Sequence, residues 1–274
     1  MKALLPDSLP EALGMLVDEP TAVLLAGGTD LLVHWPDNHA ARDATYLDLG
    51  RVNELRPHRW TDDALILGGT TTYWDVIRDP RATEHLPLLV DAARQVGAVQ
   101  IQSRGTSAGN IANGSPAADG VPVLMAYDAV VVVQAERGVE EIPLSEFYLG
   151  YKELRLAGDQ LIREIRVPLA ARTRQRFDKV GSRRAQAIAK VGLATVLAAD
   201  GWRVVAASMA PTVRRCPSVE TLFDSGDPIG SPDEIEVALG ADVTPIDDIR
   251  STADYRRRVA ARLLYYGLED SPSR

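Results

Sequence analysis

The sequence predicts an α+β protein, with two small lobes at about residues 1–53 and 54–170 and a C-terminal domain over residues 171–274. Two observations predict the lobes: in each, a short apolar run ends in paired glycines, and helix-start signals accompany it. A third observation predicts the last domain, because two β-prone runs joined by Asp200-Gly201 form a strong hairpin signal and helical patterns follow them. A chain of 274 residues is long enough for about two domains.

The first lobe opens with a predicted helix over residues 9–17. Ser8 with Glu11 three residues later forms a capping box, and four apolar residues share one face of the helix. Residues 21–26 then form a β-prone run that stops at Gly27-Gly28, and a further short run occupies residues 45–49.

The second lobe begins with a predicted strand at residues 64–67, followed by a helix capped near Thr71 or Thr72 and another helix from about 87 to 97. Residues 104–122 consist almost entirely of turn-forming residues, which predicts a long loop held between core elements. Loops of that length are usually functional or disordered, and the apolar flanks favour function. Residues 160–168 alternate apolar and charged side chains, as a half-exposed strand does.

The C-terminal domain begins with a basic stretch over residues 172–190. Strands are predicted at 191–199 and 203–209, and helices at 233–239 and 252–267. The basic stretch is interpreted either as a solvated face or as a docking surface for acidic partners. It sets seven basic residues against Asp178 alone: Arg172, Arg174, Arg176, Lys179, Arg183, Arg184 and Lys190.

Composition excludes several classes of protein. No apolar run approaches the roughly 18 residues of a membrane helix, and the N-terminal residues contain no secretory apolar region. A net charge of -8 disfavours nucleic acid and anionic membranes as partners. Cys216 is the single cysteine, so this chain alone cannot hold a disulfide, a cysteine-based zinc site or an iron-sulfur cluster. We expect a cytoplasmic protein with no metal site, no nucleic-acid partner and no membrane insertion.

Two glycine-containing loops, at residues 24–31 and 106–110, are the segments that indicate a ligand-binding function. Glycine reaches positive φ without steric cost and lets backbone N–H groups converge on an anion such as a pyrophosphate. The alternative for either loop alone is a tight turn without a ligand. Neither loop fits the Gly-x-Gly-x-x-Gly or P-loop pattern, which removes the simplest nucleotide-binding folds.

Three segments together resemble the FAD-binding medium subunit of the molybdenum hydroxylases, which include xanthine dehydrogenase and molybdenum-type carbon monoxide dehydrogenase. They are residues 26–32 (Ala-Gly-Gly-Thr-Asp-Leu-Leu), 106–125 and 179–191. The resemblance covers almost the whole chain and is closer to the xanthine dehydrogenase branch. It implies a two-lobed FAD-binding domain of the PCMH or vanillyl-alcohol oxidase type over 1–170. Residues 171–274 would form a domain of the carbon monoxide dehydrogenase flavoprotein type, a small antiparallel sheet packed on helices.

The resemblance also implies cofactor-binding residues. The first loop would wrap the FAD pyrophosphate, Asp119 would contact the adenosine ribose, Ile162 would pack beside the cofactor, and Lys179 would reach the flavin end. Ala108 stands where the family usually has glycine, so a positive φ there would strain the second loop. The loop residues are Leu24, Leu25, Ala26, Gly27, Gly28, Thr29, Asp30, Leu31, Thr106, Ser107, Ala108, Gly109 and Asn110.

Structural roles are the alternatives for the same side chains. Ile162 fits a strand core, and Lys179 fits a solvated basic face. Asp119 could cap the helix that begins near Val121, and Asp30 could cap a short helix after the first loop.

The function implied is electron transfer through FAD within a multi-subunit molybdenum hydroxylase. A large subunit would hold the molybdenum-pterin cofactor and a small subunit two [2Fe-2S] clusters, in a dimer of heterotrimers, and this FAD would reduce NAD⁺ or another acceptor. We find no hydrolytic triad or paired carboxylates in the sequence, so no catalytic residue is assigned, and flavin brings its own redox chemistry. The rivals are a stand-alone flavin oxidoreductase acting on a small substrate and a cofactor-free scaffold of the same fold.

Overall fold

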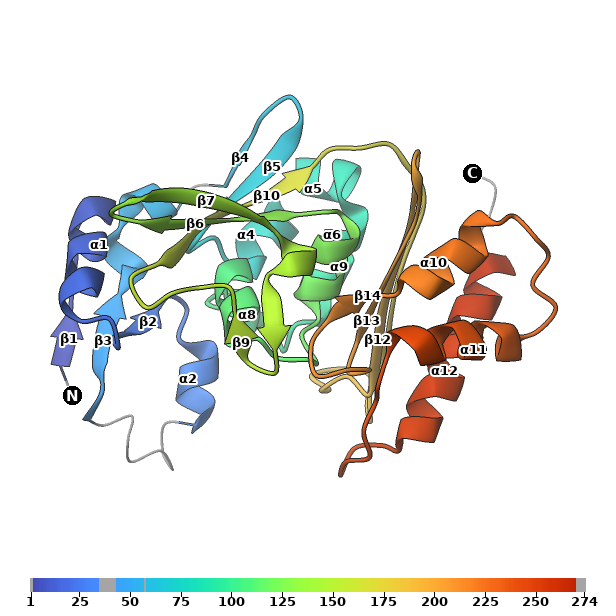
Figure 1. Cartoon of the computed structure of the whole chain (residues 1–274). Helices are drawn as coiled ribbons and strands as arrows, with labels where there is room; N and C mark the ends of the chain where they lie inside the picture. The colour runs from blue at the N-terminus through green and yellow to red at the C-terminus, as the bar shows by residue number, and fades with distance from the viewer. Residues whose placement is uncertain (1, 35–42, 57, 270–274) are drawn as a thin grey trace.

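The computed structural model describes residues 2–34, 43–56 and 58–269. The first lobe is a three-stranded parallel sheet in the order β1-β3-β2, covered by helix α1 (Figure 1). Ser8 caps α1 by accepting a bond from the Glu11 amide, as the sequence predicts. The elements of this lobe are β1 (Lys2–Leu4), α1 (Leu9–Asp18), β2 (Val23–Leu25), α2 (Thr29–His34), β3 (Thr45–Asp48) and the 3-10 turns η1 (Leu49–Arg51) and η2 (Asn53–Leu55).

The second lobe contains a five-stranded antiparallel sheet in the order β4-β5-β10-β6-β7, together with a group of short helices and a small hairpin. Its strands are β4 (His58–Trp60), β5 (Ala64–Gly68), β6 (Val130–Ala135), β7 (Gly138–Pro143), β8 (Tyr148–Gly150), β9 (Glu153–Leu154) and β10 (Leu161–Pro168). Its helices are α4 (Tyr73–Arg78), α5 (Pro80–His85), α6 (Pro87–Gln95), α7 (Val99–Gln102), α8 (Ser107–Asn113), α9 (Gly120–Ala126) and the turn η3 (Leu144–Glu146).

Strand β10 is the central strand of this sheet, and its apolar and charged residues differ in burial as the alternating pattern predicts. It pairs with β5 on one side and β6 on the other. Ile165 and Val167 lie in the main core, whereas the side chains of Arg163 and Arg166 remain partly exposed. Glu164 is tolerated there because three arginine side chains surround its carboxylate, those of Arg59, Arg163 and Arg166. The charged side chains of this strand therefore form a partly exposed, ion-paired face, and Glu164 is buried within it.

The C-terminal domain is a four-stranded antiparallel sheet in the order β11-β12-β13-β14 with three helices on its outer face. The Asp200-Gly201 hairpin joins β12 to β13 as predicted, with φ of +122° at Gly201. The elements are β11 (Arg172–Val180), β12 (Val191–Ala198), β13 (Gly201–Ala207), β14 (Arg214–Arg215), α10 (Pro217–Asp224), α11 (Pro232–Asp242) and α12 (Ala253–Glu269).

The C-terminal sheet lies between two layers of helices (Figure 1). Its outer face packs on α10, α11 and α12, with Val204 and Leu239 in that core. Its inner face contributes Val196 and Val205 to the main core of the second lobe, and α9 packs against β12 and β13. The second lobe and the C-terminal domain thus share one apolar interface, which fixes their relative position beside the cleft described below.

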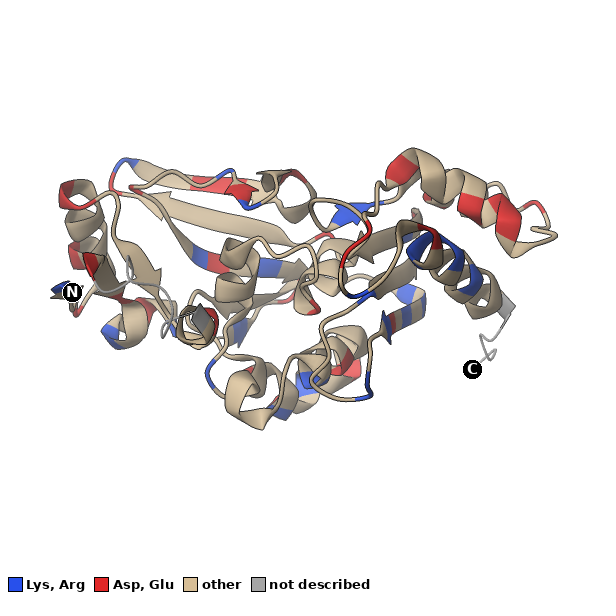
Figure 2. Cartoon of the chain, turned by 90° about the horizontal axis from the view of Figure 1, so that it is seen from below, with Lys and Arg blue, Asp and Glu red and all other residues tan. Residues whose placement is uncertain are grey.

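Charged residues of both signs are interspersed along the molecule when it is viewed from below (Figure 2). Within the described residues, no helix combines the length and apolarity that crossing a membrane would require.

Candidate cofactor-binding cleft

A cleft of about 750 Å³ opens where both glycine loops meet the second lobe and the C-terminal domain. This volume lies within the range of 300–1,000 Å³ that is typical of small-molecule sites. All of the residues predicted to bind a cofactor line this cleft except Leu25, Ser107 and Lys179.

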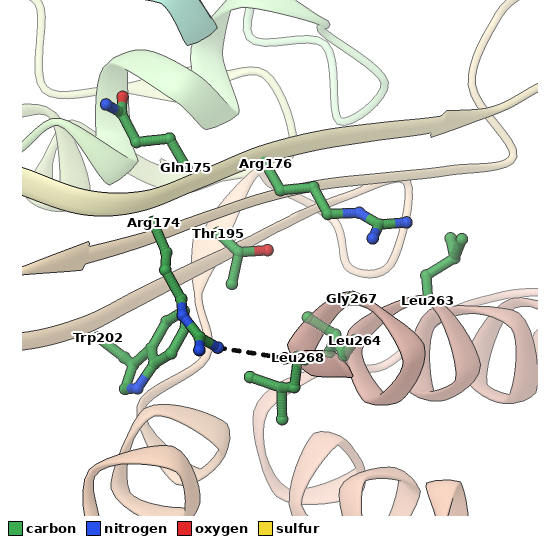
Figure 3. Close-up of a pocket in the computed structure, with 9 residues that line it drawn as sticks. All are labelled: Arg174, Gln175, Arg176, Thr195, Trp202, Leu263, Leu264, Gly267 and Leu268. Carbon is green, nitrogen blue, oxygen red and sulfur yellow. Dashed lines mark hydrogen bonds between the residues drawn. The ribbon is translucent and has the colours of Figure 1, made fainter. Parts of the chain in front are cut away.

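A second, much smaller pocket lies between the C-terminal sheet and α12 (Figure 3). Its volume of about 30 Å³ has room for only a few water molecules. Arg174 closes one end by donating a hydrogen bond to the carbonyl of Leu268 at 3.2 Å. It is too small for a dinucleotide, so the large cleft is the candidate site.

The first glycine loop packs directly on the backbone that leads into the second. A Cβ atom at Gly27 would overlap the carbonyl oxygen of Arg104, and Gly28 has φ of +71°. A side chain at position 27 is therefore sterically excluded. The close approach leaves bare backbone along this edge of the cleft, which suits a pyrophosphate group.

The second loop is not a loop, so the prediction of one long loop over 104–122 is wrong. Residues 107–113 form helix α8, and α9 begins at Gly120. The Thr106 hydroxyl caps α8 by accepting a bond from the Gly109 amide at 2.9 Å, and Gly114 ends it with φ of +61°. The turn-forming residues Thr106 and Gly114 thus act as the two caps of α8. Burial of Ile111 in the main core further stabilises this short helix.

Ala108 lies inside α8 and is buried. The non-glycine residues with positive φ in the described part of the chain are Asp128, Lys152, Gln186 and Ser208. The strain that would follow from a positive φ at Ala108 is therefore absent. Ser107 is also buried, and its hydroxyl has no hydrogen-bond partner among the described residues.

Side chains tie α8 to the rest of the cleft. Asn113 donates a hydrogen bond to the Asp30 carboxylate at 3.1 Å, which links α8 to α2. Asn110 accepts a bond from the Tyr73 hydroxyl at 2.8 Å, and burial raises the pKa of Tyr73, so this phenol stays neutral. The two glycine loops are therefore held in one arrangement by backbone packing and by polar side chains.

Asp119 and Lys179 form a largely buried ion pair at 2.7 Å, which connects the start of α9 to β11. Asp119 makes no capping bond to α9. The Lys179 ammonium also donates to the carbonyl of Gln95 at 3.0 Å. Burial raises the pKa of Asp119 to about 6, and the nearby Lys179 charge opposes that shift. Asp119 lines the cleft, whereas Lys179 stands behind it.

Because the two side chains lie 2.7 Å apart, the expected contacts of Asp119 with the adenosine ribose and of Lys179 with the flavin end would have to lie close together, and both contacts stay predictions. With two of its three donors used inside the protein, Lys179 acts on the cleft chiefly through the Asp119 carboxylate.

Ile162 lines the cleft and also belongs to the main core, so its role in the strand core is confirmed, while its packing beside the cofactor stays a prediction. It lies beside an irregularity in the pairing of β10 with β6.

Sequence reasoning missed several lining residues. Tyr73 begins α4, Tyr151 follows β8, and three residues of the 181–190 segment together with Arg250 come from the C-terminal domain: Gln186, Ala187 and Ile188. The motif at 179–191 marks this segment, although the resemblance implies a role for Lys179 alone within it. Nothing in the local pattern marked Arg250.

Most of the basic stretch is engaged within the chain, which disfavours a free docking surface. Arg172 lies over the Tyr127 ring at 4.2 Å, and Lys190 lies 5.8 Å from the Tyr255 ring. Arg176 pairs with Asp178, while Arg183 donates to two carbonyls of its own segment.

The chain matches two family profiles. The first, described as the FAD binding domain in molybdopterin dehydrogenase, covers residues 1–170. The second, described as the CO dehydrogenase flavoprotein C-terminal domain, covers residues 176–271.

Individual relatives match along nearly the whole chain. The xanthine dehydrogenase FAD-binding subunit of Escherichia coli O157:H7 is 30% identical over 258 residues, which are 91% of this chain and 88% of that subunit. The carbon monoxide dehydrogenase medium chain of Hydrogenophaga pseudoflava is 30% identical over 270 residues, 94% of this chain and 92% of that one. Because these identities are equal, the expected nearness to the xanthine dehydrogenase branch stays a prediction.

A solved structure extends the comparison to the fold. Carbon monoxide dehydrogenase from Hydrogenophaga pseudoflava, in a form lacking the Mo-pyranopterin moiety of its cofactor, superposes with a TM-score of 0.87 at 29% identity. The superposition covers 98% of this chain and 96% of that chain. The α+β fold predicted from the sequence, with a C-terminal antiparallel sheet packed on helices, is confirmed.

Proposed function

Because the chain belongs to the family of FAD-binding domains of molybdopterin dehydrogenases, we propose that its FAD carries electrons from an iron-sulfur partner to NAD⁺ or another acceptor. The observation that carries this proposal is the cleft of about 750 Å³ that both glycine loops line. FAD, when bound, supplies the redox chemistry, and the protein need only bind and orient it.

Different residues of the cleft would bind different parts of the cofactor. We propose that the bare backbone at Gly27 and Gly28 and the amides around Thr106 receive the pyrophosphate. Ile162 would form an apolar wall, and Asp119, held by Lys179, would accept hydrogen bonds at one end of the cofactor. The polar side chains at the cleft support a binding role over acid-base catalysis, because Asp30, Tyr73, Asp119 and Arg250 already have partners.

We propose partner subunits that hold the redox cofactors which this chain does not bind. Cys216 is buried and is the chain's single cysteine, so [2Fe-2S] clusters would have to belong to a small partner subunit. A large partner subunit would hold the molybdenum-pterin cofactor and hydroxylate the substrate. We propose a dimer of heterotrimers and NAD⁺ or another acceptor as the electron sink.

The first test is cofactor content. The purified chain should show the visible flavin spectrum and release about one FAD per chain. FMN and riboflavin, which lack the pyrophosphate and the adenosine, should bind far more weakly if the glycine loops hold the pyrophosphate. A colourless protein that fails to bind added FAD would contradict the proposal and favour the cofactor-free scaffold.

The second test concerns electrons and partners. Anaerobic addition of NADH to the FAD-loaded chain should bleach the flavin band if NAD⁺ is the acceptor, and a band that persists would exclude NAD⁺. Tagged chain isolated from its own cells should carry a molybdenum-containing large chain and an iron-sulfur small chain. Turnover of a small substrate by the isolated chain would instead favour the stand-alone oxidoreductase.

A further inference from the structure

Arg256 is a buried charge far from the glycine loops in sequence, projecting from α12 into the C-terminal domain. Its guanidinium donates to three acceptors from separate segments. These are the Lys190 carbonyl at 3.0 Å, the Ser208 carbonyl at 2.8 Å and the Asp248 carboxylate at 2.7 Å. The remaining Nε has no partner among the described residues.

Each of the three acceptors lies in, or is hydrogen-bonded to, a segment that lines the cleft. Lys190 ends the 181–190 segment, in which Gln186, Ala187 and Ile188 line the cleft. Asp248 also accepts bonds from the amide and the guanidinium of Arg250, another lining residue. Hydrogen bonds from this turn and from Arg256 outweigh the effect of burial and lower the pKa of Asp248 to about 2, so the carboxylate stays charged.

Ser208 connects the same cluster to the second lobe. Its amide donates to the carbonyl of Pro116 at 2.7 Å, and Pro116 lines the cleft three residues before Asp119. Its hydroxyl donates to the carbonyl of Ala189 at 2.8 Å. Ser208 holds φ of +62°, a conformation that a serine keeps only when its surroundings enforce it.

We propose that Arg256 is the positioning residue for the C-terminal wall of the cleft. One guanidinium fixes the 181–190 segment, the 248–250 turn and, through Ser208, the Pro116 segment. A planar group with five donors can serve three acceptors at once, whereas a lysine ammonium on a flexible stem cannot reproduce that spread. Arg256 does not touch the cleft itself, so its effect on a bound dinucleotide passes through the residues it holds.

The test uses the full chain without FAD. The 181–190 segment contains Arg183 and Arg184, both exposed, so trypsin cleavage after them reports how firmly the segment is held. In Arg256→Met we expect the initial rate of this cleavage, followed by mass spectrometry, to rise about tenfold, because charge-assisted hydrogen bonds are lost. Arg256→Lys should show most of the same increase.

Two controls separate positioning from general destabilisation. Arg258 lies on the same helix but is exposed and pairs with Asp254, so Arg258→Met should leave the cleavage rate unchanged. Leu264→Ala removes a buried side chain from the outer core and lowers overall stability without touching the cluster. If Leu264→Ala accelerates cleavage at Arg183 and Arg184 as much as Arg256→Met does, the proposal fails.

A milder variant keeps the test informative if Arg256→Met does not fold. Ser208→Ala removes only the bond to the Ala189 carbonyl and should raise the cleavage rate by about twofold to threefold. Wild-type rates in both Arg256→Lys and Ser208→Ala would overturn the proposal.

A second measurement rests on the proposed FAD binding. The dissociation constant for FAD should rise about tenfold in Arg256→Met and stay unchanged in Arg258→Met. If wild-type chain binds no FAD, the proposed function fails while the cleavage result still decides the role of Arg256. If cleavage accelerates but FAD affinity is unchanged, Arg256 holds the segment without positioning the cofactor wall, which also contradicts the proposal.

Discussion

The two walls of the cleft are built by different means. The wall from residues 1–170 is set chiefly by backbone conformation, with Gly27 packed on the Arg104 carbonyl and Thr106 capping α8, and neutral side-chain hydrogen bonds such as Tyr73 to Asn110 support it. The wall from the C-terminal domain is held by charged side chains that bridge long stretches of sequence, Lys179 to Asp119 and Arg256 to Lys190.

This difference predicts different responses to substitution. A backbone wall excludes any side chain at its closest contact, whatever the chemistry of that side chain. A wall held by ion pairs depends on both partners of each pair. Replacing one partner therefore lowers the free energy of unfolding more than replacing both does.

The largest effect is expected at the Asp119–Lys179 pair. Lys179→Met should lower the free energy of unfolding of the FAD-free chain by about 3 to 5 kcal/mol, because it leaves a buried carboxylate unpaired. The double variant with Asp119→Leu should recover most of that loss. Urea unfolding of the wild type, both single variants and the double variant measures the coupling.

Lys190→Met is the matched control, since its ammonium only lies over the Tyr255 ring and is partly exposed. It should cost less than about 1 kcal/mol. Additive effects of the two single substitutions at 119 and 179 would show that the pair is not a bridge between the walls.

The next effect tests the backbone wall. Gly27→Ala should weaken FAD binding about 100-fold, near 3 kcal/mol, because the new Cβ overlaps the Arg104 carbonyl and pushes the loops apart. Gly240→Ala in α11 is the control, because no atom lies within 4 Å of its Cβ position and alanine favours helix. Near-normal FAD affinity in Gly27→Ala would mean that the loop contact does not shape the site.

The same contrast explains what could be predicted from the sequence. Features set by backbone conformation can be predicted from a few adjacent residues of the sequence. Examples are Gly27-Gly28, the Ser8 cap and the Asp200-Gly201 turn. The short α8 was missed because its cap and its C-terminal glycine look like loop residues, and only tertiary burial of Ile111 stabilises so short a helix.

Bridges leave no comparable signature. A lysine in a basic stretch looks solvated until its partner is known, and Asp119 lies 60 positions from Lys179. Arg256 stands among other arginines of α12, and nothing in the helical pattern marks it as the buried one. The resemblance to a known family identified Asp119 and Lys179, but their direct contact required the structure.

The stability of the chain should also depend on pH through Asp119, the acidic member of the Asp119–Lys179 pair. Burial raises the pKa of Asp119 from its ordinary 3.8 to about 6. Between these values the folded chain holds a proton that the unfolded chain has released, so this residue makes stability fall as pH rises from about 4 to about 6. Asp119→Asn should remove that component, seen as a flatter dependence of Tm on pH in the FAD-free chain. Identical pH profiles for the two proteins would assign the titration to other groups.

The smallest effect concerns Ala108, the position at which the resemblance implies a glycine. Ala108 is helical and buried, so Ala108→Gly should lower the free energy of unfolding by only about 0.5 to 1 kcal/mol and leave FAD affinity unchanged. Ala112→Gly, one turn later in α8, controls for the general cost of glycine in this helix. If Ala108→Gly instead stabilised the protein or tightened FAD binding, the loop would adopt a positive φ when the cofactor is bound. The backbone wall would then be a surface that rearranges on binding rather than one formed in advance.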